Sequence, residues 1–177
     1  MANGGLMTKP TRRKTAPALA RTDRHTRTVR DILRAFATRG VLRNFDERTG
    51  RGGKSEFRFN WLLDQPFRLV FDPAKSQLEL KDVLPHVPSR SHLDLSVRRF
   101  VEGRADKSLP SHRRIDPGKV IVSHVNRKSH VSFQFFVKRN QYTYAVPKVL
   151  NFCNELFGYL DLNHVQYLWA HMGVPEE

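Results

Sequence analysis

The sequence is short of cysteine and of long apolar runs, and each shortage excludes a class of protein. Cys153 is the single cysteine among 177 residues, which rules out an intrachain disulfide and a zinc cluster of several thiolates. No run of about 18 apolar residues occurs, and the opening, Met1 to Lys14, lacks the apolar stretch of a secretory signal. We therefore expect a cytoplasmic protein, in a reducing compartment, that does not enter a membrane.

Acidic residues are also few, with 17 Asp and Glu against 31 Lys and Arg. The excess is uneven: residues 1–53 hold 13 basic and 4 acidic residues, whereas residues 54–177 hold 18 and 13. A positive field of this size attracts polyanions such as nucleic acid, acidic protein segments or anionic lipid surfaces. Since most of the excess lies in residues 1–53, we expect a polyanion to bind the N-terminal part of the chain, although a role in solubility alone would also explain the charge.

The length fits one domain of ordinary size, preceded by a basic segment. Residues 8–26 are rich in Lys, Arg, Thr, Pro and Ala, show no periodicity and contain one large apolar residue, Leu19. Such a segment buries too little apolar surface to offset its ordering entropy. We predict a disordered basic arm over residues 1–26 and a single α+β domain over residues 27–177.

The domain is expected to begin with a helix and to continue as a three-stranded meander. Apolar residues at helical spacing follow a capping-box pattern, Thr28-x-x-Asp31, and the helix should end near Gly40. Residues 47–55 are expected to form a glycine-rich loop. Three short strands with alternating apolar residues should follow, represented by Phe57, Leu69 and Leu80.

The second half of the chain repeats the change between helical and extended patterns. Ser91-x-x-Asp94 predicts a second helix that ends near Gly103, and residues 119–125 and 130–138 predict a hairpin. A third helix should start near Thr143, and a short fourth helix should end at Gly173. The expected order is α-β-β-β-α-β-β-α with an added C-terminal helix, as an antiparallel sheet packed by helices.

This order of elements, over about residues 28–160, resembles the type III secretion chaperone-like fold that the YbjN family shares. No residue motif accompanies the resemblance. It implies a non-enzymatic protein that binds protein segments along a sheet or helix face, often as a homodimer. The chain differs from the secretion chaperones in charge, because those proteins are typically acidic.

Motifs for catalysis are not apparent in the sequence. Gly53-Lys54-Ser55 ends like a P-loop, but Arg48 stands where the first glycine is required, and a strand is expected to follow in place of a helix. His124 and His130 could approach each other across the hairpin, yet the sequence offers no third metal ligand. Cys153 falls on the apolar stripe of the third helix, which is typical of a core thiol. We expect no enzyme, no cofactor and no metal.

The first binding hypothesis is a polyanion, RNA or DNA, held by the basic arm, the first helix and the glycine-rich loop. Such contacts would be salt-dependent and largely independent of base sequence. The predicted nucleic-acid-binding residues are Lys9, Arg12, Arg13, Lys14, Arg21, Arg24, Arg27, Arg30, Arg34, Arg51 and Lys54. Aromatic residues of the strands, among them Phe57 and Phe135, would offer stacking platforms if exposed, but their alternation is more typical of a core.

The second hypothesis is a protein-interaction module that holds a segment of another protein, or a second copy of itself as a homodimer. Phe136 alternates with the apolar residues of its strand, so it should be exposed if those residues are buried. The two hypotheses are compatible, and the sequence does not identify the nucleic acid or the protein partner.

Overall fold

The structure of the protein is a computed structural model that describes residues 16–175. Within them, six strands form one antiparallel sheet in the order β1-β2-β3-β4-β6-β5. The strands are β1 (Arg43–Thr49), β2 (Ser55–Trp61), β3 (Gln65–Asp72), β4 (Gln77–Leu84), β5 (Val120–Arg127) and β6 (His130–Val137). The helices are α1 (Ala16–Thr38), α2 (His92–Glu102), α3 (Tyr142–Asn163) and α4 (Val165–His171). The α+β class and the expected order of elements are confirmed, and β1 is an additional strand.

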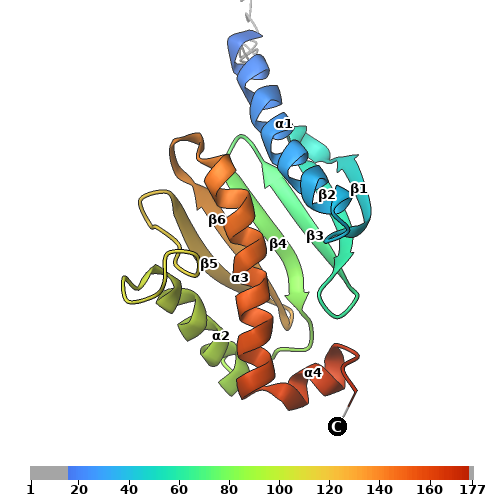
Figure 1. The fold of residues 1–177 in the computed structure, drawn as a ribbon, viewed down its shortest axis with the longest axis vertical. Helices are drawn as coiled ribbons and strands as arrows, with labels where there is room; N and C mark the ends of the chain where they lie inside the picture. Colours follow the sequence, from blue (N-terminus) through green and yellow to red (C-terminus); the bar gives the residue numbers. More distant parts are fainter. Residues whose placement is uncertain (1–15, 176–177) are drawn as a thin grey trace, which may run out of the picture.

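The helices gather on one face of the sheet (Figure 1). α3 runs along the middle of this face, with α1 and α2 on opposite sides of it, and α4 turns back beneath its end. α1 extends well past the edge of the sheet at its N-terminal end. No described helix is both long and apolar enough to cross a membrane.

The core lies between α3 and the helix-facing side of the sheet. Phe152 of α3 places its ring 5.0 Å from that of Phe133 and 5.3 Å from that of Phe135. These three rings are almost completely buried, as are Phe57 and Leu69 on the neighbouring strands. The alternation of apolar residues therefore predicted the buried face correctly, and it removes the aromatic residues from any role as stacking platforms.

The opposite face of the sheet is covered by no described helix and carries charged side chains of both signs. Ion pairs join them as Arg58–Glu56, Arg68–Asp82 and Lys81–Glu79. Two apolar side chains interrupt this polar surface, since Ile121 and Phe136 face each other across β5 and β6 and are 45% and 38% exposed. The expected exposure of Phe136 is confirmed.

The first helix begins earlier than the sequence indicated. α1 starts at Ala16, so residues 16–26, assigned to the disordered arm, are helical; residues 1–15 of that arm lie outside the described part of the chain. Ala and Arg are strong helix formers, and extending a helix that is already packed avoids the cost of nucleation. Thr28 is consequently inside the helix, where its hydroxyl donates to the carbonyl of Arg24, and the predicted capping box there is wrong.

The additional strand lies in a segment that the sequence assigned partly to a loop. Phe45 is the single large apolar residue of β1, so no period-two pattern marks it. Its ring stacks on those of Phe57 and Phe59, at 6.0 and 6.4 Å. Charged residues on the remaining positions suit an edge strand, because they discourage pairing with another chain. The predicted loop over residues 47–55 is thereby shortened to the turn between β1 and β2.

Candidate nucleic-acid interface

The exposed face of α1 holds the first group of predicted residues. Arg21, Arg24 and Arg27 follow one another at intervals of three, so they lie near each other on the helix surface. All three are exposed, and none takes part in an ion pair with a described carboxylate. They lie in the N-terminal half of α1, the end of which projects past the sheet (Figure 1).

A ring contact attaches this part of α1 to the body of the protein. The His25 ring lies 5.1 Å from that of Tyr142, which is buried at the start of α3 and packs against Phe71. Burial lowers the pKa of His25, and the positive charges of Arg21 and Arg24 lower it further. The neighbouring arginines thus create a positive local potential that disfavours another cation.

Further along α1, the basic residues are held by a carboxylate. Arg30 Nε donates to both carboxylate oxygens of Glu47, at 2.7 Å each, and Arg34 Nη2 lies 3.5 Å from one of them. The hydrogen bond to Glu47 raises the pKa of Arg30, against the opposing effect of burial. Val29 and Leu33, on the inner face, are fully buried. The C-terminal half of α1 is therefore fixed by packing and by Glu47.

The turn between β1 and β2 lies next to α1 and closes a cleft of about 450 Å³. Gly50 N–H donates to the Lys54 carbonyl at 2.8 Å, and the turn passes through Gly52 and Gly53 at φ of 71° and 76°. L side chains rarely adopt that backbone region, so these two positions favour glycine. The cleft is lined by Thr22, Asp23, Thr26, Arg30, Thr49, Gly52, Gly53, Lys54, Ser55, Pro73 and Ala74.

The cleft contains compensated charges. Lys54 Nζ lies 3.3 Å from Asp72 Oδ2, and the other oxygen of Asp72 accepts hydrogen bonds from the backbone of Ala74 and Lys75. Asp72 is buried and committed to this turn. Lys54 and Arg30 therefore enter the cleft already paired. Arg27 and Arg51, next in sequence to the lining residues Thr26 and Gly52, are exposed.

The predicted residues fall into three groups. Lys9, Arg12, Arg13 and Lys14 lie outside the described residues. Arg21, Arg24, Arg27 and Arg51 are exposed. Arg30, Arg34 and Lys54 are ion-paired. The structure brings Arg30 and Lys54 to one cleft, although 24 positions separate them in the sequence.

A buried polar cluster between α2 and β5 was missed by the sequence analysis. Asp94 is 1% exposed and accepts hydrogen bonds from the Asn126 amide at 2.9 Å and the Arg90 N–H at 2.8 Å. His124 Nε2 lies 2.9 Å from its carboxylate, without hydrogen-bond alignment. The capping pattern located Asp94, but no sequence signal indicated that residues some 30 positions away would contact it.

Opposing effects set the ionisation of this cluster. Burial disfavours the carboxylate of Asp94, but hydrogen bonds from Asn126 and Arg90, with the nearby charges of His124 and Arg98, hold its pKa below the ordinary value. Burial lowers the pKa of His124, and Asp94 offsets this only in part. The pair therefore consists of an ionised carboxylate and a histidine that resists protonation.

A serine in the middle of α2 also contacts a histidine at the start of α4. Ser96 Oγ lies 2.9 Å from His164 Nε2 and 2.5 Å from the Tyr159 hydroxyl, and Ser96 is buried. These bonds join α2 to the end of α3 and the start of α4. Histidines 124 and 130 are not opposite one another, because His124 pairs with Phe133 and His130 with Arg127 in the hairpin register.

Metal ligands do not cluster in the part of the chain that the structure describes, where no three His, Cys, Asp or Glu side chains are placed to hold an ion. Cys153 is fully buried on α3, and burial raises the pKa of its thiol. Comparison of the chain with family models, with curated proteins and with solved structures gives no match.

Proposed function

We propose that the protein binds RNA or DNA through the exposed arginines of α1. The observation that supports this most is the placement of Arg21, Arg24 and Arg27 on the exposed face of α1, where none of them has a described carboxylate partner. Side chains held on one rigid face can reach several phosphates of one strand. Arg51, exposed in the turn between β1 and β2, is a further basic side chain for this contact.

The contacts would be made to the phosphate backbone. Phe57, Phe59, Phe67 and Phe135 are in the core, so base stacking on these strand aromatics is not part of the proposal. Each phosphate neutralised by a basic side chain releases condensed counterions, so the affinity should fall steeply as salt rises. Preference for a particular base sequence is not expected.

Charge substitution tests this interface better than deletion of residues 1–26, because deletion removes three turns of α1 and the contact between His25 and Tyr142. The first variant carries Arg21→Gln, Arg24→Gln and Arg27→Gln. Its matched control carries Arg98→Gln, Arg127→Gln and Arg139→Gln, which lower the net charge equally at exposed sites elsewhere. Fluorescence anisotropy with labelled RNA and DNA oligonucleotides, at two salt concentrations, gives the affinity and its salt dependence.

The α1 variant should bind about tenfold more weakly at low salt, with a salt slope reduced by about 0.7–0.9 for each lost phosphate contact. The control variant should retain most of the affinity. An equal loss of affinity in both variants would show that binding depends only on net charge, which would contradict an interface on α1. A further variant that lacks residues 1–14 measures how much Lys9, Arg12, Arg13 and Lys14 add.

A second candidate function is self-association through the uncovered face of the sheet, the homodimer that the resemblance implies. This face carries both basic and acidic side chains, joined in ion pairs, so the same face of a second copy can offer complementary charges. Ile121 and Phe136 would supply the apolar centre. Light scattering after size exclusion should then show a dimer that Phe136→Ser converts to a monomer; a monomeric parent protein would remove this candidate.

A further inference from the structure

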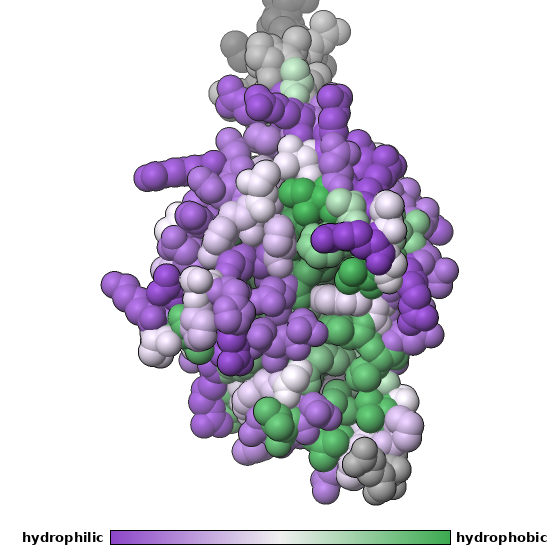
Figure 2. Space-filling model, in the orientation of Figure 1, coloured by the Kyte–Doolittle hydropathy of each residue, from purple (hydrophilic) through white to green (hydrophobic). Residues whose placement is uncertain are grey.

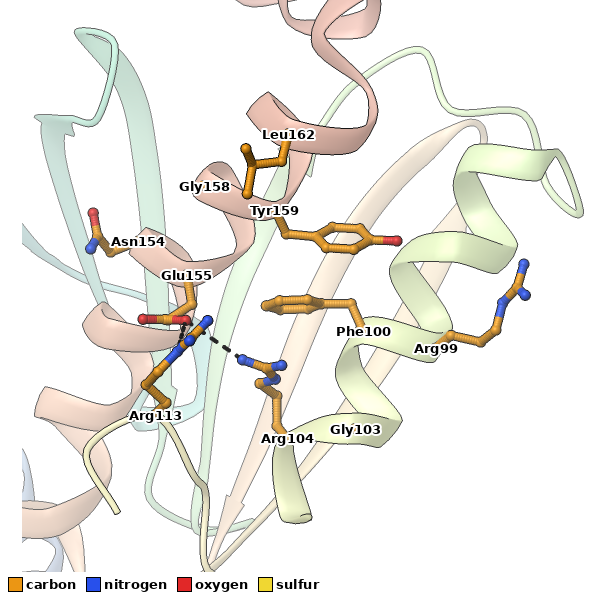
Figure 3. Close-up of a pocket in the computed structure, with 10 residues that line it drawn as sticks. All are labelled: Arg99, Phe100, Gly103, Arg104, Arg113, Asn154, Glu155, Gly158, Tyr159 and Leu162. Atoms are coloured by element: carbon orange, nitrogen blue, oxygen red, sulfur yellow. Dashed lines mark hydrogen bonds and ion pairs between the residues drawn. The ribbon is translucent and has the colours of Figure 1, made fainter. Parts of the chain in front are cut away.

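A cleft between α2 and α3, about 540 Å³ in volume, gathers charged and aromatic side chains that the proposed nucleic-acid interface does not use. Phe100 and Arg104 come from α2 and the turn that follows it, Arg113 from the next loop, and Glu155 and Tyr159 from α3 (Figure 3). α1 lies on the other side of α3 (Figure 1), so the cleft is a separate site.

The cleft carries more positive than negative charge. Arg113 Nε donates to Glu155 Oε2 at 2.5 Å, and Arg104 Nη1 lies 3.7 Å from the same oxygen. Two guanidinium groups thus share a single carboxylate, and Arg99 adds a third positive charge from α2. Sequence analysis missed this group because its members lie in a polar segment and on two helices that only the fold brings together.

Arg104 is the unusual member of this group. Its side chain is 12% exposed, its guanidinium lies 4.1 Å from the centre of the Phe100 ring, and Nε and Nη1 have no hydrogen-bond acceptor among the described residues. Burial lowers the pKa of Arg104, with Glu155 opposing. Nε and Nη1 expose almost no surface themselves, so an anion in the cleft would act on the positive charge of the guanidinium and would not bond to these two atoms.

Apolar surface adjoins these donors. The rings of Phe100 and Tyr159 pack against each other at the wall of the cleft, with their centres 5.1 Å apart, and Leu162 beside them is 85% exposed (Figure 3). Glu155 inside the cleft would repel a phosphate dianion more strongly than a carboxylate, which carries one charge. The surroundings therefore favour a ligand with one negative charge beside an apolar group.

We propose that this cleft binds an acidic peptide segment, with a Glu or Asp carboxylate of the peptide on Arg104 and Arg113 and an adjacent apolar side chain against Phe100, Tyr159 and Leu162. The peptide carboxylate pairs with the positive charge of Arg104 and Arg113, and Glu155 competes with it for the two arginines.

The test uses a capped pentapeptide, acetyl-Ala-Leu-Glu-Leu-Ala-amide, and the same peptide with glutamine in place of glutamate. Inorganic phosphate is the third probe. Titrations are followed by the nitrogen-15 NMR signal of the Arg104 Nε–H group and by calorimetry. The glutamate peptide should bind in about the millimolar range and shift that signal, whereas the glutamine peptide should bind at least about tenfold more weakly.

Two substitutions examine the roles of the residues. Arg104→Met keeps an apolar side chain against Phe100 but removes the positive charge, so it should weaken glutamate-peptide binding by about tenfold. Arg98→Met, at an exposed position of α2, should change it by less than about twofold. Glu155→Gln removes the competing charge and should tighten binding by about threefold.

Three results would overturn the proposal: equal binding of the two peptides, phosphate binding tighter than the glutamate peptide, or weaker peptide binding by the Glu155→Gln variant. The last of these remains informative if Arg104→Met fails to fold, because Gln at position 155 preserves the size of the side chain and its ability to accept a hydrogen bond from Arg113.

Discussion

Charged side chains are exposed to solvent on the α1 side of α3 but buried on its α2 side. On the α1 side, Arg21, Arg24 and Arg27 stand in solvent on a helix that extends past the sheet. On the α2 side, Asp94 and Arg104 are enclosed between α2, β5 and α3. On the helix face, hydrophilic residues surround the projecting end of α1, and apolar surface lies lower down toward α4 (Figure 2).

Exposed and buried charges therefore contribute to different properties of the protein, namely ligand binding and folding stability. A charge in water adds little to folding stability but acts at long range on a polyanion, whereas an enclosed charge affects stability strongly through its hydrogen bonds. Substitutions on the α1 side should therefore change binding and leave stability nearly unaltered. Substitutions on the α2 side should do the reverse, except where a cleft opens to ligand.

The largest expected effect is at Asp94. Asp94→Ala removes the acceptor of the Arg90 N–H and one of the two acceptors of the Asn126 amide, and it takes the carboxylate away from His124. The free energy of unfolding should fall by about 3 kcal/mol, as measured by urea denaturation. Asp31→Ala, at an exposed position of α1, is the control and should change it by less than about 0.5 kcal/mol. Similar losses in the two variants would contradict the distinction between the sides.

The same cluster predicts a loss of stability in mild acid. The pKa of His124 is lowered from its ordinary 6.5, so below that pH the unfolded chain takes up a proton that the folded protein refuses. Stability should decline as pH falls from about 7.5 to about 5.5. Asp94, which faces His124, moderates this effect, and Arg98 reinforces it. The lowered pKa of Asp94 adds a second loss only below its ordinary value of 3.8.

His124→Asn should flatten this pH dependence, because the buried titrating group is removed. Urea midpoints at the two pH values measure the change, and His86→Asn, at an exposed position, serves as the control. The flattening will be incomplete, since the pKa of His164 is also lowered, by burial and by His92. An unchanged slope in the His124 variant would place the acid sensitivity elsewhere.

Sequence patterns predicted the features that rest on local repetition. The alternation of Phe57 with Arg58, and of Phe135 with Phe136, placed each residue on the correct face of the sheet. The helical spacing around Cys153 correctly indicated a core position. These patterns succeed because the side-chain period of a strand or helix is fixed by backbone geometry.

Contacts between distant residues gave no comparable signal. β1 is held by pairing with β2 and by the Phe45 ring, neither of which leaves a pattern in its own sequence. The joining of Arg104 and Arg113 to Glu155 depends on how α2 packs beside α3. Charge counting found the arginines of α1 but could not distinguish Arg24, which is exposed, from Arg30, which is paired with Glu47.

The two predicted capping boxes, one confirmed and one wrong, should differ in their effect on the free energy of unfolding by about 1 kcal/mol. Ser91 caps α2 and accepts a hydrogen bond from the Asp94 N–H at 3.2 Å, so Ser91→Ala should lower the free energy of unfolding by about 1 kcal/mol. Thr28 lies inside α1, and Thr28→Ala should alter stability by less than about 0.5 kcal/mol, in the stabilising direction. Thermal unfolding of the two variants compares them directly, and a larger loss for the Thr28 variant would contradict the early start of α1.

The smallest effect is expected from a substitution that frees the two ion-paired arginines of α1. Glu47→Gln removes the charge that holds Arg30 and Arg34, and because Arg30 is still partly exposed, the stability should change by less than about 1 kcal/mol. The two released arginines would extend the row formed by Arg21, Arg24 and Arg27. Nucleic-acid affinity at low salt should therefore rise about threefold, with a steeper salt dependence.

Anisotropy measurements on the Glu47→Gln variant alone, and combined with the Arg21, Arg24 and Arg27 substitutions, decide where the added affinity arises. If α1 is the interface, the gain should be largest when the row is intact, because the released side chains then act on a strand that is already bound. Glu102→Gln, an exposed position at the end of α2, makes the same change in net charge and is the control. An equal gain from this control would show that the nucleic acid responds to total charge and would remove the functional difference between the two sides.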